Sequence, residues 1–343
     1  MRIAILAHEQ FPDGAKTALG VLRYADDEVV AVLDRDRSGH RVTDFVSDVQ
    51  DAPIVAGMGD LEDDVDALLI GIAPIGGGFE ESWREDVRTA LERGCDVVSG
   101  LHYFLSEDEE FVELAAENGC ELRDVRRPPD DLSVSEGVAA DVDAEVILTV
   151  GTDCSVGKMT ATMKLARDAR AAGYDAEVIP TGQTGIMIEG WGIPVDRVVS
   201  DFTAGAVEEM ILECGDDHDY LFVEGQGSIV HPAYSGVTCG ILHGAMPDRL
   251  VLCHDAGRQA IGGYESFSLP SIPTYVDLYE RLAEPVRDAP VVAGALNTAG
   301  LAEPAAREAV DEFAASLDAP ATDVIRFGTD EVLETLLSSN PNR

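Results

Sequence analysis

The sequence predicts an α/β protein with two domains, each built on a parallel sheet with helices on both faces. Three observations support this. Short apolar runs alternate with helical patterns along nearly the whole chain, as parallel sheets require. The alternation pauses in a polar, proline-bearing stretch at residues 127–137 and restarts near Glu145. The length of 343 residues is enough for two domains of ordinary size.

The first predicted domain covers residues 1–140. Its strands are expected at 3–7, 29–33, 53–55, 67–72 and 96–99, and its helices at 81–93 and 108–118. The glycines at 71–78 follow a strand and precede a helix, but they lack the spacing of a dinucleotide fingerprint. They are weak evidence for a second nucleotide site.

The second predicted domain covers residues 141–343. After a first strand that starts at 145, further strands are expected at 177–179, 220–223, 250–253, 291–295 and 323–326. Helices are expected at 158–172, 204–213, 275–283, 304–317 and 330–337.

A glycine turn near the middle of the chain predicts a phosphate-binding loop. An apolar strand runs into a tight turn that ends in Gly157-Lys158, and a helical pattern follows. Backbone N–H groups at such a helix start lack partners and carry partial positive charge, so phosphate oxygens bind there and a lysine completes the site. The predicted cofactor-binding residues are Gly151, Thr152, Asp153, Cys154, Ser155, Val156, Gly157, Lys158, Met159 and Thr160.

The residue after the lysine does not suit a metal. A hydroxyl usually stands there and holds Mg²⁺. This chain has Met159 instead, and Thr160 lies one residue later, about 100° further around the helix. Because Mg²⁺ prefers oxygen ligands to a thioether, we expect a loop that holds phosphates without cleaving them, and no bound metal.

The charge excludes some partners. The chain has 24 Lys and Arg residues against 65 Asp and Glu residues, a net charge of −41. Such a surface repels nucleic acid and anionic membranes. The acidic residues are spread along the whole sequence, which is typical of solubility in high salt. We therefore expect a halophilic, haloarchaeal source.

The sequence also predicts a cytoplasmic enzyme. The apolar run at 1–8 is too brief for a signal peptide, and no stretch approaches the roughly 18 apolar residues of a membrane span. Its six cysteines show no C-x-x-C spacing, which disfavours zinc sites and disulfides. Open α/β sheets of this size favour a homo-oligomer, whose subunit number the sequence leaves open.

Polar segments at other strand ends supply catalytic candidates, because parallel sheets bind ligands at this edge. An apolar strand delivers Glu224 to a glycine-rich turn that continues through Gly227 and Ser228 to His231. His254 follows another strand. A carboxylate that leaves a buried strand beside a phosphate site favours a functional role, although a glutamate that only hydrogen-bonds the turn is the alternative.

Further residues are candidates for holding a substrate. Gln183 and Thr184 lie in a polar turn after a predicted strand. Arg258 has the guanidinium geometry to clamp a carboxylate, or it forms an ion pair. Lys16 stands out because the chain has so few lysines, and Arg23 lies close to it in the sequence. Packing is the alternative for both.

Two families resemble this sequence. The segments 151–158, 183–185 and 223–225 resemble dethiobiotin synthetase and its relatives, which bind ATP and Mg²⁺ but carry the hydroxyl that Met159 replaces. A second resemblance, to the DgcN-type D-glutamate N-acetyltransferases, covers nearly the whole chain. It rests on segments that occur together in that family, at 16–18, 23–24, 71–77, 83–84, 96–102, 124–129, 151–159, 183–185 and 224–232.

The second resemblance implies a Rossmann-like N-terminal domain, a P-loop NTPase-like C-terminal domain and acetyl transfer from acetyl-CoA to glutamate. Acetyl-CoA carries phosphates that a loop without metal can hold. The glutamate amine must lose a proton and attack the thioester, which requires a base and donors to the oxyanion. We rank Glu224, His231 and His254 in that order as the base, with the N–H groups of Gly227 and Ser228 as oxyanion donors.

Two other functions stay open. One is an ATP- and Mg²⁺-dependent kinase or ligase of the dethiobiotin synthetase kind, in which Thr160 or Asp153 restores metal binding together with Glu224. The other is a nucleotide-binding regulator without chemistry of its own. Whether the substrate is D- or L-glutamate is also left open by the sequence.

Overall fold

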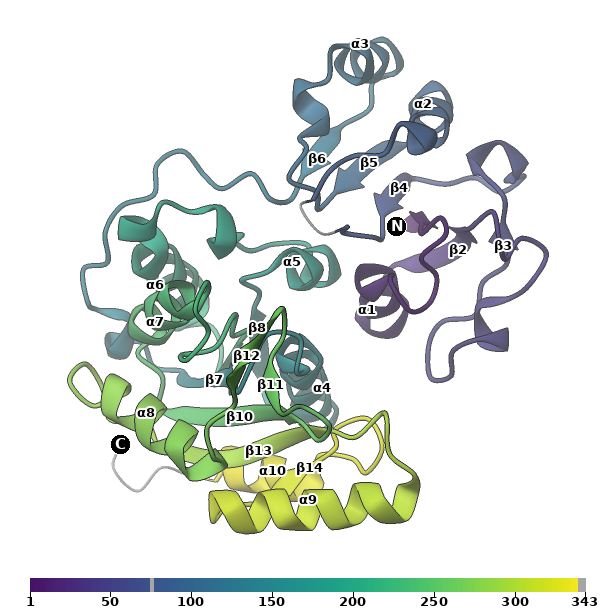
Figure 1. Ribbon diagram of the computed structural model, residues 1–343. Coiled ribbons are helices and arrows are strands. Elements are labelled where there is room, and N and C mark those ends of the chain that lie inside the picture. The colour runs from purple at the N-terminus through teal and green to yellow at the C-terminus, as the bar shows by residue number, and fades with distance from the viewer. Residues whose placement is uncertain (75–76, 339–343) are drawn as a thin grey trace. The chain divides into compact units, whose positions relative to one another are not determined.

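The computed structural model describes residues 1–74 and 77–338, which form two compact units (Figure 1). The first unit comprises Met1–Pro128 together with Gln183–Arg197, and the second comprises Pro129–Gly182 and the chain from Val198 onward. A short segment from the C-terminal half of the sequence therefore belongs to the first unit. None of the helices in the described part of the chain has the length and apolar character that a membrane span requires.

The first unit contains a six-stranded parallel sheet in the order β3-β2-β1-β4-β5-β6. This is the 3-2-1-4-5-6 strand order of Rossmann-type folds. Its strands are β1 (Arg2–Leu6), β2 (Glu28–Leu33), β3 (Ile54–Val55), β4 (Ala67–Ile70), β5 (Asp96–Ser99) and β6 (Leu122–Asp124), and its helices are α1 (Lys16–Tyr24), α2 (Arg84–Glu92), α3 (Glu109–Asn118) and α5 (Gln183–Glu189).

The central strands of this sheet are apolar because both of their faces are covered. All four residues of β4 are buried, and β1 and β2 are buried beyond their first residues. Continuous apolar runs of this kind are typical of parallel strands between helices. In α3, Asp108 caps the helix by accepting hydrogen bonds from Glu110 N and Phe111 N, and Gly119 ends it in a left-handed conformation.

The second unit contains another six-stranded parallel sheet, in the order β14-β13-β10-β7-β9-β8. Strand β7 lies between β10 and β9 in the interior of this sheet. The strands are β7 (Glu145–Gly151), β8 (Ala176–Ile179), β9 (Tyr220–Val223), β10 (Arg249–Asp255), β13 (Val291–Asn297) and β14 (Ala321–Thr322), and a separate hairpin is formed by β11 (Ala260–Ile261) and β12 (Tyr264–Ser268). The helices are α4 (Lys158–Ala171), α6 (Thr203–Cys214), α7 (Ser235–Ala245), α8 (Ile272–Ala283), α9 (Glu303–Leu317) and α10 (Asp330–Leu336).

The α/β class and most predicted elements are confirmed, but the strand predicted at 323–326 is wrong. Strand β14 ends at Thr322, and Asp323 begins a turn in which its Oδ1 accepts hydrogen bonds from Ile325 N at 3.0 Å and Arg326 N at 3.1 Å. A short acidic side chain that bonds the following backbone N–H groups favours a turn over a strand.

Helices α1, α5 and α7, strand β6 and the β11–β12 hairpin have no counterpart among the predicted elements. Helix α7 shows why. Its glycines lower helix propensity, yet α7 packs closely against α6: a Cβ on Gly244 would lie 2.3 Å from the carbonyl oxygen of Ala204. Close packing of α7 against α6 thus requires glycine, whose low helix propensity makes α7 hard to predict from the sequence.

Candidate functional site

The predicted phosphate loop connects the end of β7 to the start of α4. Five residues separate Gly151 from Gly157, one more than in the standard pattern with four. Gly157 has a φ of 102°, a left-handed conformation that favours glycine, and it stands at the N-cap of α4. Because the first turn of α4 contains no acidic residue, its N-terminus keeps the positive end of the helix dipole for an anion.

Lys158 is folded back over the loop. Its side chain is almost fully buried, and Nζ donates a hydrogen bond to the backbone carbonyl of Asp153 at 2.8 Å. Burial lowers the pKa of this lysine. An anion beside Nζ would compensate that cost, since an opposite charge favours the protonated amine.

Three buried hydroxyls hold the first carbonyl groups of the loop. Tyr279 OH donates to Gly151 O at 2.7 Å, while Tyr275 OH at 2.7 Å and Ser228 Oγ at 3.0 Å donate to Thr152 O. Both tyrosines come from α8, one turn apart, and are fully buried. Burial raises the pKa of Tyr279 to about 12, so its hydroxyl stays a donor. Of these three residues, the sequence analysis selected only Ser228, and as an oxyanion donor. The two tyrosines carry no local signal, because buried aromatic residues at helical spacing also fit a plain core.

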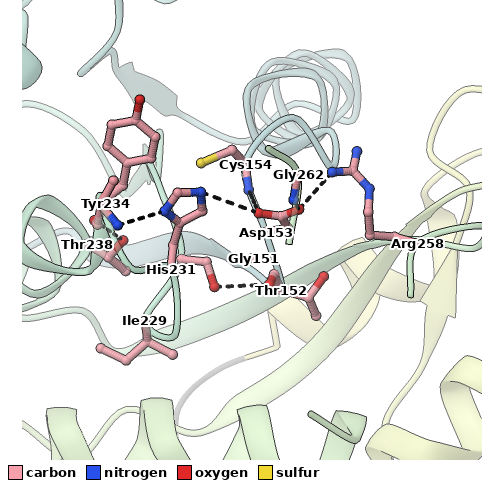
Figure 2. A network of polar contacts seen from close by, with 12 residues as sticks. Gly151, Thr152, Asp153, Cys154, Ile229, His231, Tyr234, Thr238, Arg258 and Gly262 are labelled. Atoms are coloured by element: carbon pink, nitrogen blue, oxygen red, sulfur yellow. Dashed lines mark hydrogen bonds and ion pairs between the residues drawn. The ribbon is translucent and has the colours of Figure 1, made fainter. Parts of the chain in front are cut away.

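Asp153 is buried within the loop and accepts several hydrogen bonds (Figure 2). Its Oδ1 accepts a hydrogen bond from Cys154 N at 2.7 Å, and its Oδ2 accepts one from Arg258 Nη1 and one from Gly262 N, each at 2.7 Å. Figure 2 shows Asp153 between the His231 ring and the Arg258 guanidinium. Arg258, a predicted carboxylate clamp, thus forms an ion pair with a carboxylate of the loop.

His231 faces the same aspartate. Its Nδ1 accepts a hydrogen bond from Ala233 N at 3.1 Å, and its Nε2 lies 4.0 Å from Asp153 Oδ1. In the neutral ring, a nitrogen that accepts a backbone N–H leaves the proton on the other nitrogen. Nε2 therefore presents an N–H to the loop. This geometry makes His231 a better hydrogen-bond donor than a general base.

One group of donor atoms in the described part of the chain has the proximity of a metal site. Ligand atoms of Asp153, Cys154 and His231 all lie within 4.8 Å of one another. Two features oppose a cation there. A metal-bound histidine usually donates its second ring N–H, whereas Nδ1 of His231 accepts one. The charge of Asp153 is already matched by Arg258. The expected absence of a metal stays a prediction.

Glu224 follows β9 and connects it to the end of β8. Its Oε2 accepts hydrogen bonds from Thr181 N at 3.2 Å and Gly182 N at 3.0 Å, and its backbone carbonyl accepts one from Thr181 Oγ1 at 2.6 Å. The side chain is 6% exposed. Glu224 thus hydrogen-bonds the turn after β8, as expected for a structural role. It also lies at the end of β9 beside β7, near the phosphate loop.

His254 lies near the carboxyl end of β10, next to the loop. Its Nδ1 is 2.8 Å from Thr152 Oγ1, and its ring stacks on Phe313 with centroids 5.7 Å apart. Burial lowers its pKa, so the ring is neutral near pH 7 and has one nitrogen able to accept a proton.

Four predicted substrate residues belong to the first unit. Lys16 begins α1, and Arg23 in its last turn donates from Nε to Asp48 O at 3.4 Å. Gln183 and Thr184 begin α5, where Thr184 Oγ1 lies 2.9 Å from Thr17 Oγ1. The remaining predicted site residues lie in the second unit. The glycine pattern at 71–78 includes residues 75 and 76, which lie outside the described residues.

A second polar contact fixes the start of α5 within the first unit. Arg126 Nε donates to Gln183 Oε1 at 2.8 Å and to Gly100 O at 2.6 Å. The sequence analysis did not select Arg126 as a site residue. It stands in the segment 124–129, which nevertheless contributed to the family resemblance.

Fold and site together define a two-domain α/β protein with a Rossmann-like N-terminal unit and a P-loop C-terminal unit. Residues 133–333 match the DUF1611 C-terminal P-loop domain, and residues 35–128 match the DUF1611 N-terminal Rossmann-like domain, both described as domains of unknown function. The chain belongs to the DUF1611 family.

Two named relatives and one solved structure match most of the chain. The chain is 33% identical to a D-glutamate N-acetyltransferase of Tritonibacter scottomollicae over 323 residues, 94% of each chain. It is 35% identical to a D-glutamate N-acetyltransferase of a Pseudoalteromonas species over 272 residues, 78% of this chain and 80% of the relative. The crystal structure of a DUF1611 family protein from Anabaena variabilis has a TM-score of 0.93 and 39% identity, and covers 98% of this chain and 99% of its own.

Proposed function

We propose that this protein is an N-acetyltransferase that moves the acetyl group of acetyl-CoA to the amino group of D-glutamate. Two relatives that match most of the chain are named D-glutamate N-acetyltransferase, and the choice of acetyl-CoA as the donor is part of the proposal. The observation that carries the proposal is the phosphate loop, which keeps its glycines and lysine but has Met159 where a hydroxyl would hold Mg²⁺. A catabolic role for the reaction is part of the proposal.

The loop suits the phosphates of coenzyme A. Acetyl-CoA carries a pyrophosphate and a 3′-phosphate, neither of which breaks during acetyl transfer. The start of α4 offers N–H groups, and Lys158 offers an ammonium that an anion can draw away from Asp153 O. Since no phosphate bond is cleaved, the reaction does not need a metal at the position of Met159.

The chemistry requires a base and an oxyanion site. The glutamate amine loses a proton and forms a bond to the thioester carbon, and the carbon–sulfur bond of CoA then breaks. The base receives the amine proton, which can pass to the departing thiolate. Glu224 stays our first candidate for the base because its carboxylate lies at the strand end beside β7. As a candidate base, His254 ranks above His231. The ring of His254 is neutral, whereas Nδ1 of His231 already accepts a hydrogen bond from the backbone.

The competing function is ATP-dependent kinase or ligase chemistry. It requires oxygen ligands that replace the missing hydroxyl. Asp153 is paired with Arg258 and Gly262, and Glu224 accepts two backbone N–H groups. Because the Arg258 guanidinium already matches the charge of Asp153, a second cation at this carboxylate is disfavoured by like-charge repulsion, which favours acetyl transfer. A regulator without chemistry is the third possibility.

Calorimetry distinguishes these three functions, and molar KCl suits the acidic surface of the protein. Acetyl-CoA binding that is unchanged by EDTA, together with an acetylated product found by mass spectrometry in a panel of D- and L-amino acids, supports the proposal. Binding of ATP that is lost with EDTA supports the kinase or ligase. Nucleotide binding without turnover of any amine or carboxylate supports the regulator.

A further inference from the structure

The β11–β12 hairpin is attached to the phosphate loop. Gly262, in the turn between the two strands, donates from its backbone N–H to Asp153 Oδ2 at 2.7 Å. Arg258, just before β11, donates to the same oxygen at 2.7 Å. All five residues of β12 are nevertheless exposed. The hairpin is therefore fixed at the loop while one of its strands contributes nothing to the core.

Aromatic side chains gather at this point. Tyr264 lies with its ring edge to the His231 ring at 5.2 Å, Tyr234 lies 4.6 Å from the same ring, and Phe267 lies 6.5 Å from Tyr264, all measured between ring centroids. Tyr264 is 39% exposed, and Tyr234 and Phe267 are each 52% exposed. We call Tyr234, Tyr264 and Phe267 the aromatic rim.

The rim is continuous with the phosphate loop through His231. The buried His231 ring contacts two members of the rim, and its Nε2 lies 4.0 Å from Asp153 Oδ1 in the loop. Single exposed aromatic residues need no explanation, but a contiguous exposed apolar group points to a ligand. A ligand held by its phosphates at the loop would bring its neighbouring groups to such a rim.

We propose that the aromatic rim binds the adenine ring of the nucleotide whose phosphates the loop holds. Nucleotide bases stack on exposed aromatic rings because both have flat π faces. The proposal rests on the proposed function for the identity of that nucleotide, coenzyme A, in which the adenosine is joined directly to the pyrophosphate. Tyr264 and Phe267, on the hairpin, are its specificity-determining residues.

The test compares two probes that share a pyrophosphate, of which only coenzyme A carries adenine. Dissociation constants for coenzyme A and for inorganic pyrophosphate are measured by calorimetry in molar KCl, for wild type, Tyr264→Ala and Phe267→Ala. We expect each variant to raise the dissociation constant of coenzyme A by about tenfold and to leave that of pyrophosphate within twofold. Phe267→Tyr, which keeps a ring, should bind coenzyme A like wild type.

The control is Tyr174→Ala. Tyr174 is also exposed, at 43%, but it follows the far end of α4, a helix of 14 residues that starts at the loop. Tyr174→Ala should leave the dissociation constants of coenzyme A and pyrophosphate unchanged. Equal effects on coenzyme A and pyrophosphate, or no effect on either, would overturn the proposal. So would variants that change the sedimentation coefficient but not coenzyme A affinity, because the rim would then join two copies of the chain.

A failure of the proposed function gives a different result. If wild type binds Mg-ATP but not coenzyme A, acetyl transfer from acetyl-CoA is wrong, and the rim is tested with ATP against inorganic triphosphate. A tenfold loss confined to ATP would still support the adenine site. Equal losses of ATP and triphosphate would reject it.

Discussion

Lys158 Nζ donates a hydrogen bond to the backbone carbonyl of Asp153 at 2.8 Å, so the lysine of the phosphate loop lies against the loop itself. Its side chain is buried, and burial lowers its pKa. A bound phosphate would place a further opposite charge beside this buried amine and raise its pKa. Ligand binding and the protonation of Lys158 are therefore linked.

Lys158→Ala should weaken coenzyme A binding strongly. Loss of a charge-assisted hydrogen bond of about 1.5–3 kcal/mol corresponds to a dissociation constant raised by about 10- to 100-fold. Calorimetry in molar KCl measures it. The control is Lys164→Ala, because Lys164 lies on the same helix and pairs with Asp168. Similar affinities in both variants would show that the phosphates bind elsewhere.

Tyr279→Phe tests whether the hydroxyls of α8 hold the loop in its binding shape. The substitution leaves Gly151 O without its donor and Ile229 N without its acceptor, so we expect the free energy of unfolding to fall by about 1–3 kcal/mol. Because the loop is then less ordered, KM for acetyl-CoA should rise severalfold while kcat changes little. Steady-state kinetics and chemical denaturation measure both effects.

Tyr220→Phe is the matched control for Tyr279. Tyr220 OH donates to Leu337 O at 3.2 Å from the first residue of β9, the end away from the loop. Its loss should lower stability without changing KM for acetyl-CoA. If the two variants have the same kinetics, the tyrosine of α8 supports the fold and not the loop.

Glu224→Gln should lower turnover and spare binding. A glutamine keeps one oxygen that can accept from Thr181 N or Gly182 N, but it cannot accept the amine proton. A lost general base costs about 10²- to 10⁴-fold in rate, so kcat should fall by that factor while the coenzyme A dissociation constant stays within twofold. Glu177 lies on β8 of the same sheet and forms an ion pair with Arg170 of α4, and Glu177→Gln should keep wild-type turnover. Wild-type turnover in Glu224→Gln would remove Glu224 as the base.

The lowered pKa of His254 predicts that the stability of the protein depends on pH. Burial lowers its pKa in the folded protein, so the unfolded chain binds a proton more readily, with an ordinary histidine pKa of about 6.5. The contribution of the neutral ring is therefore complete above about pH 6.5 and is lost as the pH falls from there toward the folded pKa. Thermal melts between pH 7.5 and 5 should show a smaller loss for His254→Gln than for wild type. Equal losses would contradict a buried neutral ring.

The sequence predicts the phosphate loop well because its signal is local. A strand, a glycine turn, a lysine and a helix follow one another directly, and the structure shows them in that order at β7 and α4. The parallel sheets are predictable for the same reason, since each buried strand is a continuous apolar run.

Contacts between distant segments are not predictable in this way. Gln183 and Thr184 follow a strand of the second unit but pack in the first, where Thr17 and Arg126 contact them. The sequence places Asp153 in the loop but does not show that Arg258 and Gly262 are its partners, because more than a hundred residues separate them. The roles of Arg258 and His231 depend on these partners.

The most direct test is a pair of crystals, one soaked with coenzyme A and EDTA, the other with ATP and Mg²⁺. We predict that coenzyme A places its pyrophosphate at the N-terminus of α4, with Lys158 Nζ turned from Asp153 O to a phosphate oxygen and no metal beside Met159. A loop that stays empty with coenzyme A and is filled by ATP with Mg²⁺ would contradict the proposed function.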